Sequence, residues 1–191
     1  LVNLIPRFYD ATQGEVLVDG VNVRDYSLED LRNRITTVMQ KAELYSRSIE
    51  ENIRISKPDA TPQQIKRAAE IAQADDFICN TTYGYYTPVT EGGHSLSGGQ
   101  KQRISISRAI LKEHEILIFD EPTAVLTPQE ITKLFNVLRK MRDSGKAIII
   151  ITHKLNEVLE ISDRVSVLRK GEYVGTVNTA EATEQSLTEM M

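Results

Sequence analysis

The chain has 191 residues, enough for one folded domain with a real core. Hydrophobic residues make up 40% and charged residues 26%, which is typical of a globular protein and not of a disordered one. The single cysteine excludes an internal disulfide framework, the net charge of −4 argues against a nucleic-acid surface, and the longest apolar run, at residues 147–151, is far too short to cross a bilayer.

The first part of the chain predicts a helix followed by a hairpin. Four apolar residues have the i, i+3, i+4, i+7 spacing of an amphipathic helix: Leu1, Leu4, Ile5 and Phe8. Neither an initiator methionine nor a capping residue precedes them, so we expect the back half of a helix that begins upstream. Valines then alternate on both sides of Asp19-Gly20, which predicts a hairpin over residues 14–24.

A short strand and a long helical stretch come next. Residues 36–40 have the pattern of a strand, and residues 46–111 read as mainly helical. Within that stretch, Thr61 and Gln64 form a capping box with Pro62 at the first helical position. We expect residues 46–111 to form a helical subdomain inserted into the fold.

The last part of the chain alternates strands and helices. Residues 116–119 and 148–151 are continuous apolar strands, of the type that is buried on both faces of a parallel sheet. Between them, a capping box at residues 127–130 starts a helix. The apolar stripe of that helix consists of Ile131, Leu134, Phe135, Leu138 and Met141. A helix around residues 155–159 and a hairpin around residues 165–174 follow. The predicted fold class is α/β, with a parallel sheet core, a β-hairpin region and the inserted α-helical subdomain.

Two glycines follow a serine at the start of a predicted helix, in the run Leu96-Ser97-Gly98-Gly99-Gln100. One interpretation is structural, since Ser97 and Gln100 make a capping box. A cap needs no glycines, however, and each costs about 1 kcal/mol relative to alanine inside a helix. Bare backbone there lets an anion reach free N–H groups at the positive end of the helix dipole. The pentapeptide alone leaves both interpretations open.

Polar residues follow the predicted strands at their carboxyl ends. Asp120 and Glu121 come directly after residues 116–119, His153 follows the next parallel strand, and Gln40 ends the first one. Taken singly, each has a structural explanation as a polar turn residue. Ligands of doubly wound sheets bind at the carboxyl edge, so together these residues predict one site there.

Taken in chain order, these residues resemble a known family. Residues 96–103, with the sequence LSGGQKQR, resemble the signature motif of the ABC (ATP-binding cassette) transporter ATPases. Gln40 before that motif, and Asp120-Glu121 and His153 after it, resemble the family's remaining motifs. The resemblance implies a P-loop NTPase-like fold, with ATP and Mg²⁺ as cofactors.

The resemblance also implies a role for each residue. Asp120 would hold Mg²⁺ through water, and Gln40 would sense Mg²⁺ and the attacking water. Glu121 would be the general base, and His153 would contact the γ-phosphate. The residues implied to grip an ATP held by a partner domain are Ser97, Gly98, Gly99 and Gln100.

The implied partners are a second ATPase domain, paired head to tail, and the transmembrane domain of a transporter. Residues 1–10 resemble the stretch that follows the phosphate loop in exporters, and residues 87–93 resemble the x-loop, which contacts exporter transmembrane domains. Thr90 stands where the x-loop pattern has glycine. We expect a location on the cytoplasmic face of a membrane, held through the transmembrane partner, and no nucleic-acid partner.

The sequence departs from the family because it contains no G-x-x-x-x-G-K-[ST] loop. The family places this phosphate-binding loop just before Leu1, so we interpret residues 1–191 as a single ATPase domain that is incomplete at its N-terminus. Loss of the loop's charge-assisted hydrogen bonds would remove roughly 6–15 kcal/mol, against about 8 kcal/mol for micromolar binding. We therefore expect no useful ATP binding in the chain's own site.

A second departure follows Pro122, where exporters have an aspartate-containing loop. From Thr123 onward the sequence resembles sugar- or nucleoside-type importer ATPases, whereas the part up to about Ile110 resembles exporters. We therefore hypothesise a mosaic, joined within residues 111–122. The facing core residues of the two halves need not be matched in such a chain.

Three functions compete at this point. The first is an ATPase domain that couples ATP hydrolysis to transport. The second is a non-catalytic interaction module, which the missing loop favours and the retained Glu121 and His153 disfavour. The third is an ABC ATPase of DNA repair or translation, which the sequence disfavours because no coiled-coil, zinc-binding or basic insertion interrupts residues 46–111.

Overall fold

A computed structural model describes residues 2–90, 93, 95–112 and 114–191. The chain forms two compact units, residues 1–150 and residues 151–191. In order, the first unit contains η1 (Val2–Leu4), β1 (Leu17–Val18), β2 (Val21–Asn22), α1 (Leu28–Arg34), β3 (Ile35–Val38), α2 (Ile49–Arg54), α3 (Pro62–Ile71), α4 (Asp75–Cys79), η2 (Gly84–Tyr86), α5 (Gly98–Lys112), β4 (Ile116–Asp120), α6 (Pro128–Asp143) and β5 (Ala147–Ile151), which ends at the boundary. The second unit contains α7 (Leu155–Ile161), β6 (Arg164–Arg169), β7 (Glu172–Asn178), η4 (Thr179–Glu181) and α8 (Glu184–Met190).

A three-stranded parallel sheet in the order β3-β4-β5 confirms the predicted α/β class. Strands β3 and β4 pair in register from Ile35 opposite Ile116 to Val38 opposite Phe119. In the middle strand β4, residues 117–119 are fully buried, as the apolar run predicts, whereas Ile116 is half-buried. The expectation that β5 is equally buried is wrong. Its Ile149 is 38% exposed because β5 lies at the edge of the sheet among the described residues.

The predicted hairpin near the N-terminus is confirmed, whereas the prediction of a helix before it is wrong. Strands β1 and β2 join through Asp19 and Gly20, whose φ angles of 51° and 78° give the left-handed turn that Asp-Gly favours. Before them, only the short 3₁₀ helix η1 forms. Pro6 lacks the N–H that a continuing helix needs, and Arg7 has a left-handed φ of 54°, so the helix cannot continue.

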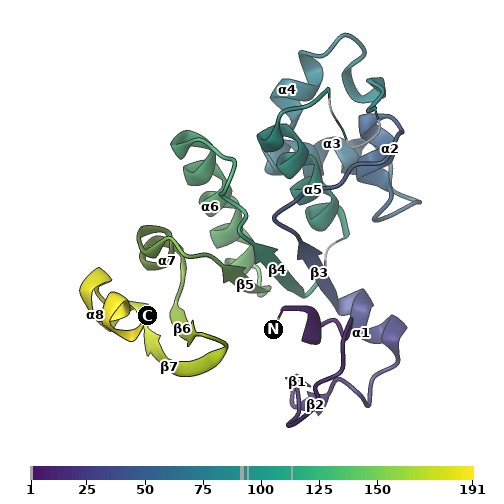
Figure 1. The fold of residues 1–191 in the computed structure, drawn as a ribbon. Coiled ribbons are helices and arrows are strands. Elements are labelled where there is room, and N and C mark those ends of the chain that lie inside the picture. Colours follow the sequence, from purple (N-terminus) through teal and green to yellow (C-terminus); the bar gives the residue numbers. More distant parts are fainter. Residues whose placement is uncertain (1, 91–92, 94, 113) are drawn as a thin grey trace. The chain divides into compact units, whose positions relative to one another are not determined.

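The helices between β3 and β4 pack around α5 (Figure 1). Thr61 caps α3 in the predicted capping box, which fixes the start of that helix. Side chains from α2, α3, α4 and α5 share one apolar core, which includes Ile49, Ile53, Ile65, Ile78 and Ile104. In the part of the chain that the structure describes, no helix is both long and apolar enough to span a bilayer.

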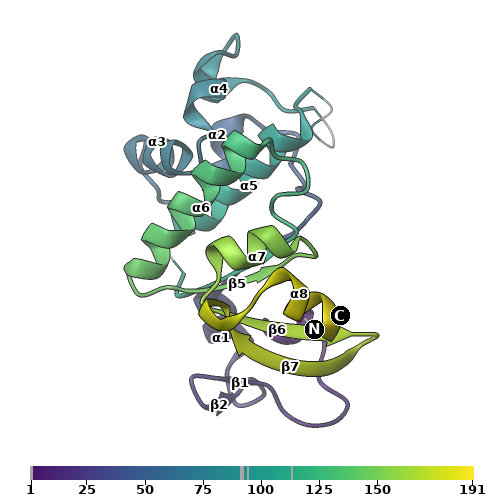
Figure 2. The ribbon, with the colours of Figure 1, turned by 90° about the vertical axis from the view of Figure 1, so that its left-hand side faces the viewer.

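Helix α6 begins at the second predicted capping box, where Thr127 accepts a hydrogen bond from the backbone N–H of Glu130. Its predicted stripe is buried except for Ile131, which is half-buried. In Figure 2, α6 runs along the same side of the first unit as α5. In the second unit, Lys170 and Gly171 form the left-handed turn of the predicted hairpin between β6 and β7.

The buried His114 is expected to make folding stability depend on pH. Its Nδ1 lies 2.6 Å from Oγ1 of Thr36, and burial, aided by the charge of Lys112, lowers the pKa of the imidazole from its usual 6.5. Just below that value the unfolded chain therefore binds more protons than the folded one. Stability is complete above the usual pKa and falls as the pH drops toward the lowered pKa. Urea unfolding at about pH 7.5 and pH 5.5 should show a smaller pH dependence for His114→Gln than for wild type. Equal pH dependence in the two proteins would contradict this role.

Candidate functional site

The acid pair lies where the buried strand β4 leaves the core. Asp120 is the last residue of β4, and Glu121 follows it with a left-handed φ of 47°. A glutamate rarely adopts this backbone conformation, and such strain is concentrated at functional sites. The carbonyl of Glu121 accepts a hydrogen bond of 3.2 Å from the N–H of Ala124, which closes the turn, and Oε2 of Glu121 is buried. The turn thus holds a carboxylate in a fixed place at the carboxyl edge of the sheet.

Gln40 lies at the same edge of the sheet as the acid pair. Strand β3 ends at Val38, two residues earlier than predicted, and Val38 pairs with Phe119 of β4. The chain segments that leave these two paired strands therefore start side by side, one leading to Gln40 and the other to Asp120 and Glu121. Gln40 is exposed, so its amide is accessible to a ligand at this edge.

At the tip of α5 the capping-box interpretation of the glycine motif is confirmed, and the anion-binding interpretation stays a prediction. The Ser97 hydroxyl accepts a hydrogen bond of 3.2 Å from the N–H of Gln100, and Oε1 of Gln100 accepts one of 2.8 Å from the N–H of Ser97. Ser97 and Gly98 are exposed, whereas Gly99 is buried. A Cβ at Gly99 would lie 3.2 Å from the carbonyl oxygen of Val125. Packing thus favours glycine at position 99, and the exposure of Ser97 and Gly98 is compatible with the predicted anion contact.

A cavity of about 420 Å³ connects the glycine tip to Gln40. Gln40, Gly98, Lys101 and Gln102 all contribute to its lining. Gln102 is 1% exposed, and neither polar atom of its side chain has a hydrogen-bond partner among the described residues. The sequence predicted Gln40 and Gly98 separately, but it did not predict that one hollow joins them.

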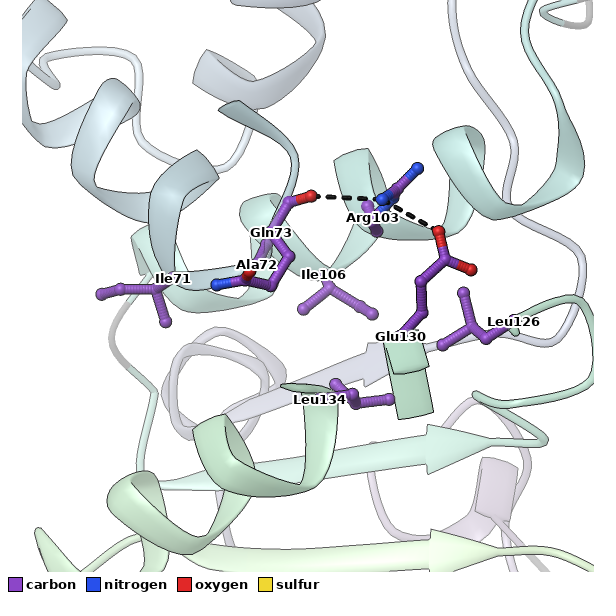
Figure 3. A pocket seen from close by; sticks show the side chains of 8 residues that line it. All are labelled: Ile71, Ala72, Gln73, Arg103, Ile106, Leu126, Glu130 and Leu134. Carbon is purple, nitrogen blue, oxygen red and sulfur yellow. Dashed lines mark hydrogen bonds and ion pairs between the residues drawn. The ribbon is translucent and has the colours of Figure 1, made fainter. Parts of the chain in front are cut away.

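Arg103 joins α5 to helix α6 and to the segment that follows α3, as Figure 3 shows. Its Nη1 lies 2.9 Å from Oε1 of Glu130 in α6 and donates a hydrogen bond of 3.3 Å to the carbonyl of Gln73, which follows α3. Its guanidinium also lies 4.9 Å from the centre of the Phe77 ring. Glu130 belongs to the capping box that starts α6, so Arg103 ties the glycine-tipped helix to the segment after the acid pair.

His153 and the predicted x-loop are not part of the arrangement described so far. His153 lies in the second unit, two residues after β5 ends, and its approach to the acid pair remains a prediction. The predicted x-loop, residues 87–93, includes residues 91 and 92, which lie outside the described residues. Its first part joins the helical region through two backbone hydrogen bonds, from Ile49 to Thr87 and from Val89 to Arg47.

The residues at the sheet edge fit a Mg²⁺ ion that is bound together with a nucleotide. Across the described residues, no three His, Cys, Asp or Glu side chains come close enough to hold a metal by themselves. Phosphate-transfer sites do not need such a cluster, because Mg²⁺ there binds one or two carboxylates, waters and substrate phosphates. The half-buried Asp120 and the exposed Gln40 supply hard oxygen donors of that kind.

Comparison with known proteins shows the family to which the chain belongs. Residues 1–124 match the family model of the ABC transporter. The chain belongs to the ABC transporter family. As an ABC transporter chain, it has the signature motif at the tip of α5 and the acid pair at the end of β4.

Two curated relatives are named as putative multidrug export proteins. The chain is 42% identical over 179 residues to a putative multidrug export ATP-binding/permease protein of Staphylococcus aureus (strain NCTC 8325 / PS 47), a match that covers 92% of this chain and 30% of that protein. It is 43% identical over 171 residues to the putative multidrug export ATP-binding/permease protein YgaD of Bacillus subtilis (strain 168), covering 90% of this chain and 29% of that protein. The chain thus spans less than a third of the length of these curated relatives.

A solved structure agrees with these matches. A bacterial Atm1-family ABC exporter with ATP bound superposes with a TM-score of 0.92 at 31% sequence identity. The superposition covers 99% of this chain and 33% of that chain. The fold of this ABC transporter chain is therefore that of one part of an exporter.

Proposed function

We propose that the chain is the ATP-hydrolysing domain of an ABC exporter, where it couples ATP hydrolysis to transport across a membrane. The observation that supports this most strongly is the convergence of Gln40 and the acid pair at one sheet edge. The relatives' names support the exporter assignment. We place the domain on the cytoplasmic face, attached through a transmembrane partner.

In this proposal each predicted site residue has one role. Glu121 accepts the proton of the attacking water, and Gln40 orients that water. Asp120 would hold Mg²⁺, which would neutralise charge on the phosphates when bound. His153 contacts the γ-phosphate. The strained, left-handed backbone of Glu121 at the end of β4 supports the assignment of the base, since such strain is concentrated at functional sites.

The exposed tip of α5 serves a second ATPase domain in a head-to-tail dimer. Ser97 and Gly98 present open backbone, so they reach the ATP that the phosphate loop of the partner holds. Gly99 and Gln100 shape this tip through the Val125 contact and the capping box. The chain can therefore act on its partner's ATP even where its own site lacks a phosphate loop.

The proposal is tested with an extended chain, in which a G-x-x-x-x-G-K-[ST] loop and its preceding strand are joined ahead of Leu1. Isothermal titration should show no micromolar ATP binding by the chain of residues 1–191, because the hydrogen bonds that loop supplies are worth roughly 6–15 kcal/mol in total. The extended chain should bind ATP in the micromolar range and hydrolyse it with Mg²⁺. Micromolar binding by the unextended chain would refute the expected dependence on the loop. An extended chain that binds ATP without hydrolysing it would refute the proposed activity.

A non-catalytic interaction module is the second candidate. It predicts that the chain pairs with a complete ATPase domain and leaves the rate of hydrolysis unchanged. An ATPase assay of the complete domain, with and without this chain, separates the two candidates because the proposed function requires an increase.

A further inference from the structure

The segment between β3 and α2, residues 39–48, connects Gln40 to the helical region without regular secondary structure of its own. Apart from the bridge of Ser48 with Pro88, most backbone groups of the segment do not pair within a helix or sheet, so side chains are needed to fix it. Leu44 is the buried apolar anchor of the segment. Further hydrogen bonds to the segment come from two polar residues, the nearby Asn52 of α2 and Arg108 of α5, which is far away in sequence.

Asn52 is fully buried, and both the oxygen and the nitrogen of its carboxamide form hydrogen bonds with this segment. Its Oδ1 accepts a hydrogen bond of 2.9 Å from the N–H of Tyr45. Its Nδ2 donates to the carbonyls of Tyr45 at 3.0 Å, Arg47 at 3.3 Å and Ser48 at 3.0 Å. A buried amide that is satisfied in this way specifies one backbone path.

Arg108 ties the same segment to the signature helix. Its Nε donates to the carbonyl of Asn52 at 2.7 Å, its Nη2 to Oδ1 of Asn52 at 2.6 Å, and its Nη1 to the carbonyl of Glu43 at 2.7 Å. Its guanidinium also lies 5.6 Å from the centre of the Tyr45 ring. Burial lowers the pKa of this guanidinium, which nevertheless stays protonated as arginine does in proteins. One rigid fork therefore holds α5, α2 and the segment together.

We propose that Arg108 and Asn52 are positioning residues for Gln40. Glu43, which Arg108 holds, lies three residues after Gln40, and Gln40 shares a cavity with Gly98 at the other end of α5. The pair thus sets the distance between the sheet edge and the signature tip. This inference rests on the proposed function, in that it assigns to Gln40 a place whose accuracy matters for hydrolysis.

The first test measures hydrogen exchange in the chain of residues 1–191. Arg108→Lys keeps the charge but loses the fork, so the Tyr45 amide and its neighbours in residues 42–48 should exchange about tenfold faster, with β4 unchanged. Arg67→Lys, on the exposed face of α3, is the matched control and should leave exchange unchanged. Unchanged exchange at Tyr45 in Arg108→Lys would overturn the proposal.

The second test separates positioning from general stabilisation in the extended chain. Arg108→Lys should lower kcat for ATP about tenfold and change KM less than about twofold. In a Gln40→Ala background the same substitution should cause no further loss, because its effect passes through Gln40. Equal losses in both backgrounds would overturn the proposal. An extended wild-type chain without ATPase activity would contradict the proposed function. The hydrogen-exchange comparison would then test by itself whether Arg108 fixes residues 42–48.

Discussion

Glu121→Gln in the extended chain is expected to lower kcat for ATP hydrolysis by about 10²–10⁴-fold, the range that general base catalysis contributes. Glutamine has nearly the same shape and keeps the turn at the end of β4, but it cannot accept the proton of the attacking water. ATP binding should stay within about twofold, since the phosphate loop and not Glu121 holds the nucleotide. Single-turnover kinetics together with isothermal titration would measure the two effects separately.

The matched control for this substitution is Glu115→Gln. Glu115 precedes the other end of the same strand, and its side chain is 66% exposed and lies 3.7 Å from Arg34. A surface ion pair of this kind contributes little, so the control should retain its kcat and its thermal stability. If Glu121→Gln retained more than about a tenth of the wild-type kcat, the assignment of the general base would be wrong.

Gly98→Asp is expected to abolish the ability of this chain to stimulate a partner domain. The substitution places a negative charge at the exposed tip of α5, where we propose that the partner's ATP binds. Each charge-assisted hydrogen bond that is lost there is worth about 1.5–3 kcal/mol, so stimulation should fall at least tenfold. A sensitive assay mixes residues 1–191 with an extended chain that itself carries Gly98→Asp, because the unextended chain then supplies the intact tip.

Gly98→Ala distinguishes charge from size in the same mixture. Its Cβ would lie 3.4 Å from Val125, an ordinary contact, so most of the stimulation should remain. Equal loss in the alanine and aspartate variants would mean that the tip tolerates no side chain, and the anion-binding interpretation would lose its support. Circular dichroism of both variants should confirm that α5 still forms.

Signals that lie within a few residues of one another predicted much of this fold. The capping boxes at Thr61 and Thr127 start α3 and α6 as predicted, because a capping box depends on four consecutive residues. The hairpin turns at Asp19-Gly20 and Lys170-Gly171 are equally local. The predicted helix over the first residues failed because apolar spacing alone did not outweigh Pro6, which ends the short 3₁₀ turn.

Contacts between distant residues could not be predicted in this way. Asn52 and Arg108 are 56 residues apart, and neither has a distinctive sequence context. Val125 also gave no signal, although its carbonyl explains why residue 99 must be small. The candidate site was predicted as a set of residues at strand ends. The left-handed turn at Glu121 and the cavity that joins Gln40 to Gly98 emerge only from the packed structure.

We expect the left-handed backbone at Glu121 to lower the thermal stability of the chain, although in the proposed function the glutamate itself is needed for hydrolysis. Glycine would relax that turn by about 1–2 kcal/mol, so selection of this chain for heat resistance alone would favour losing the glutamate. A lineage freed from the need to hydrolyse ATP should therefore drift away from glutamate at this position sooner than at relaxed surface sites. The residue would then serve as a marker of whether a descendant still works as an enzyme.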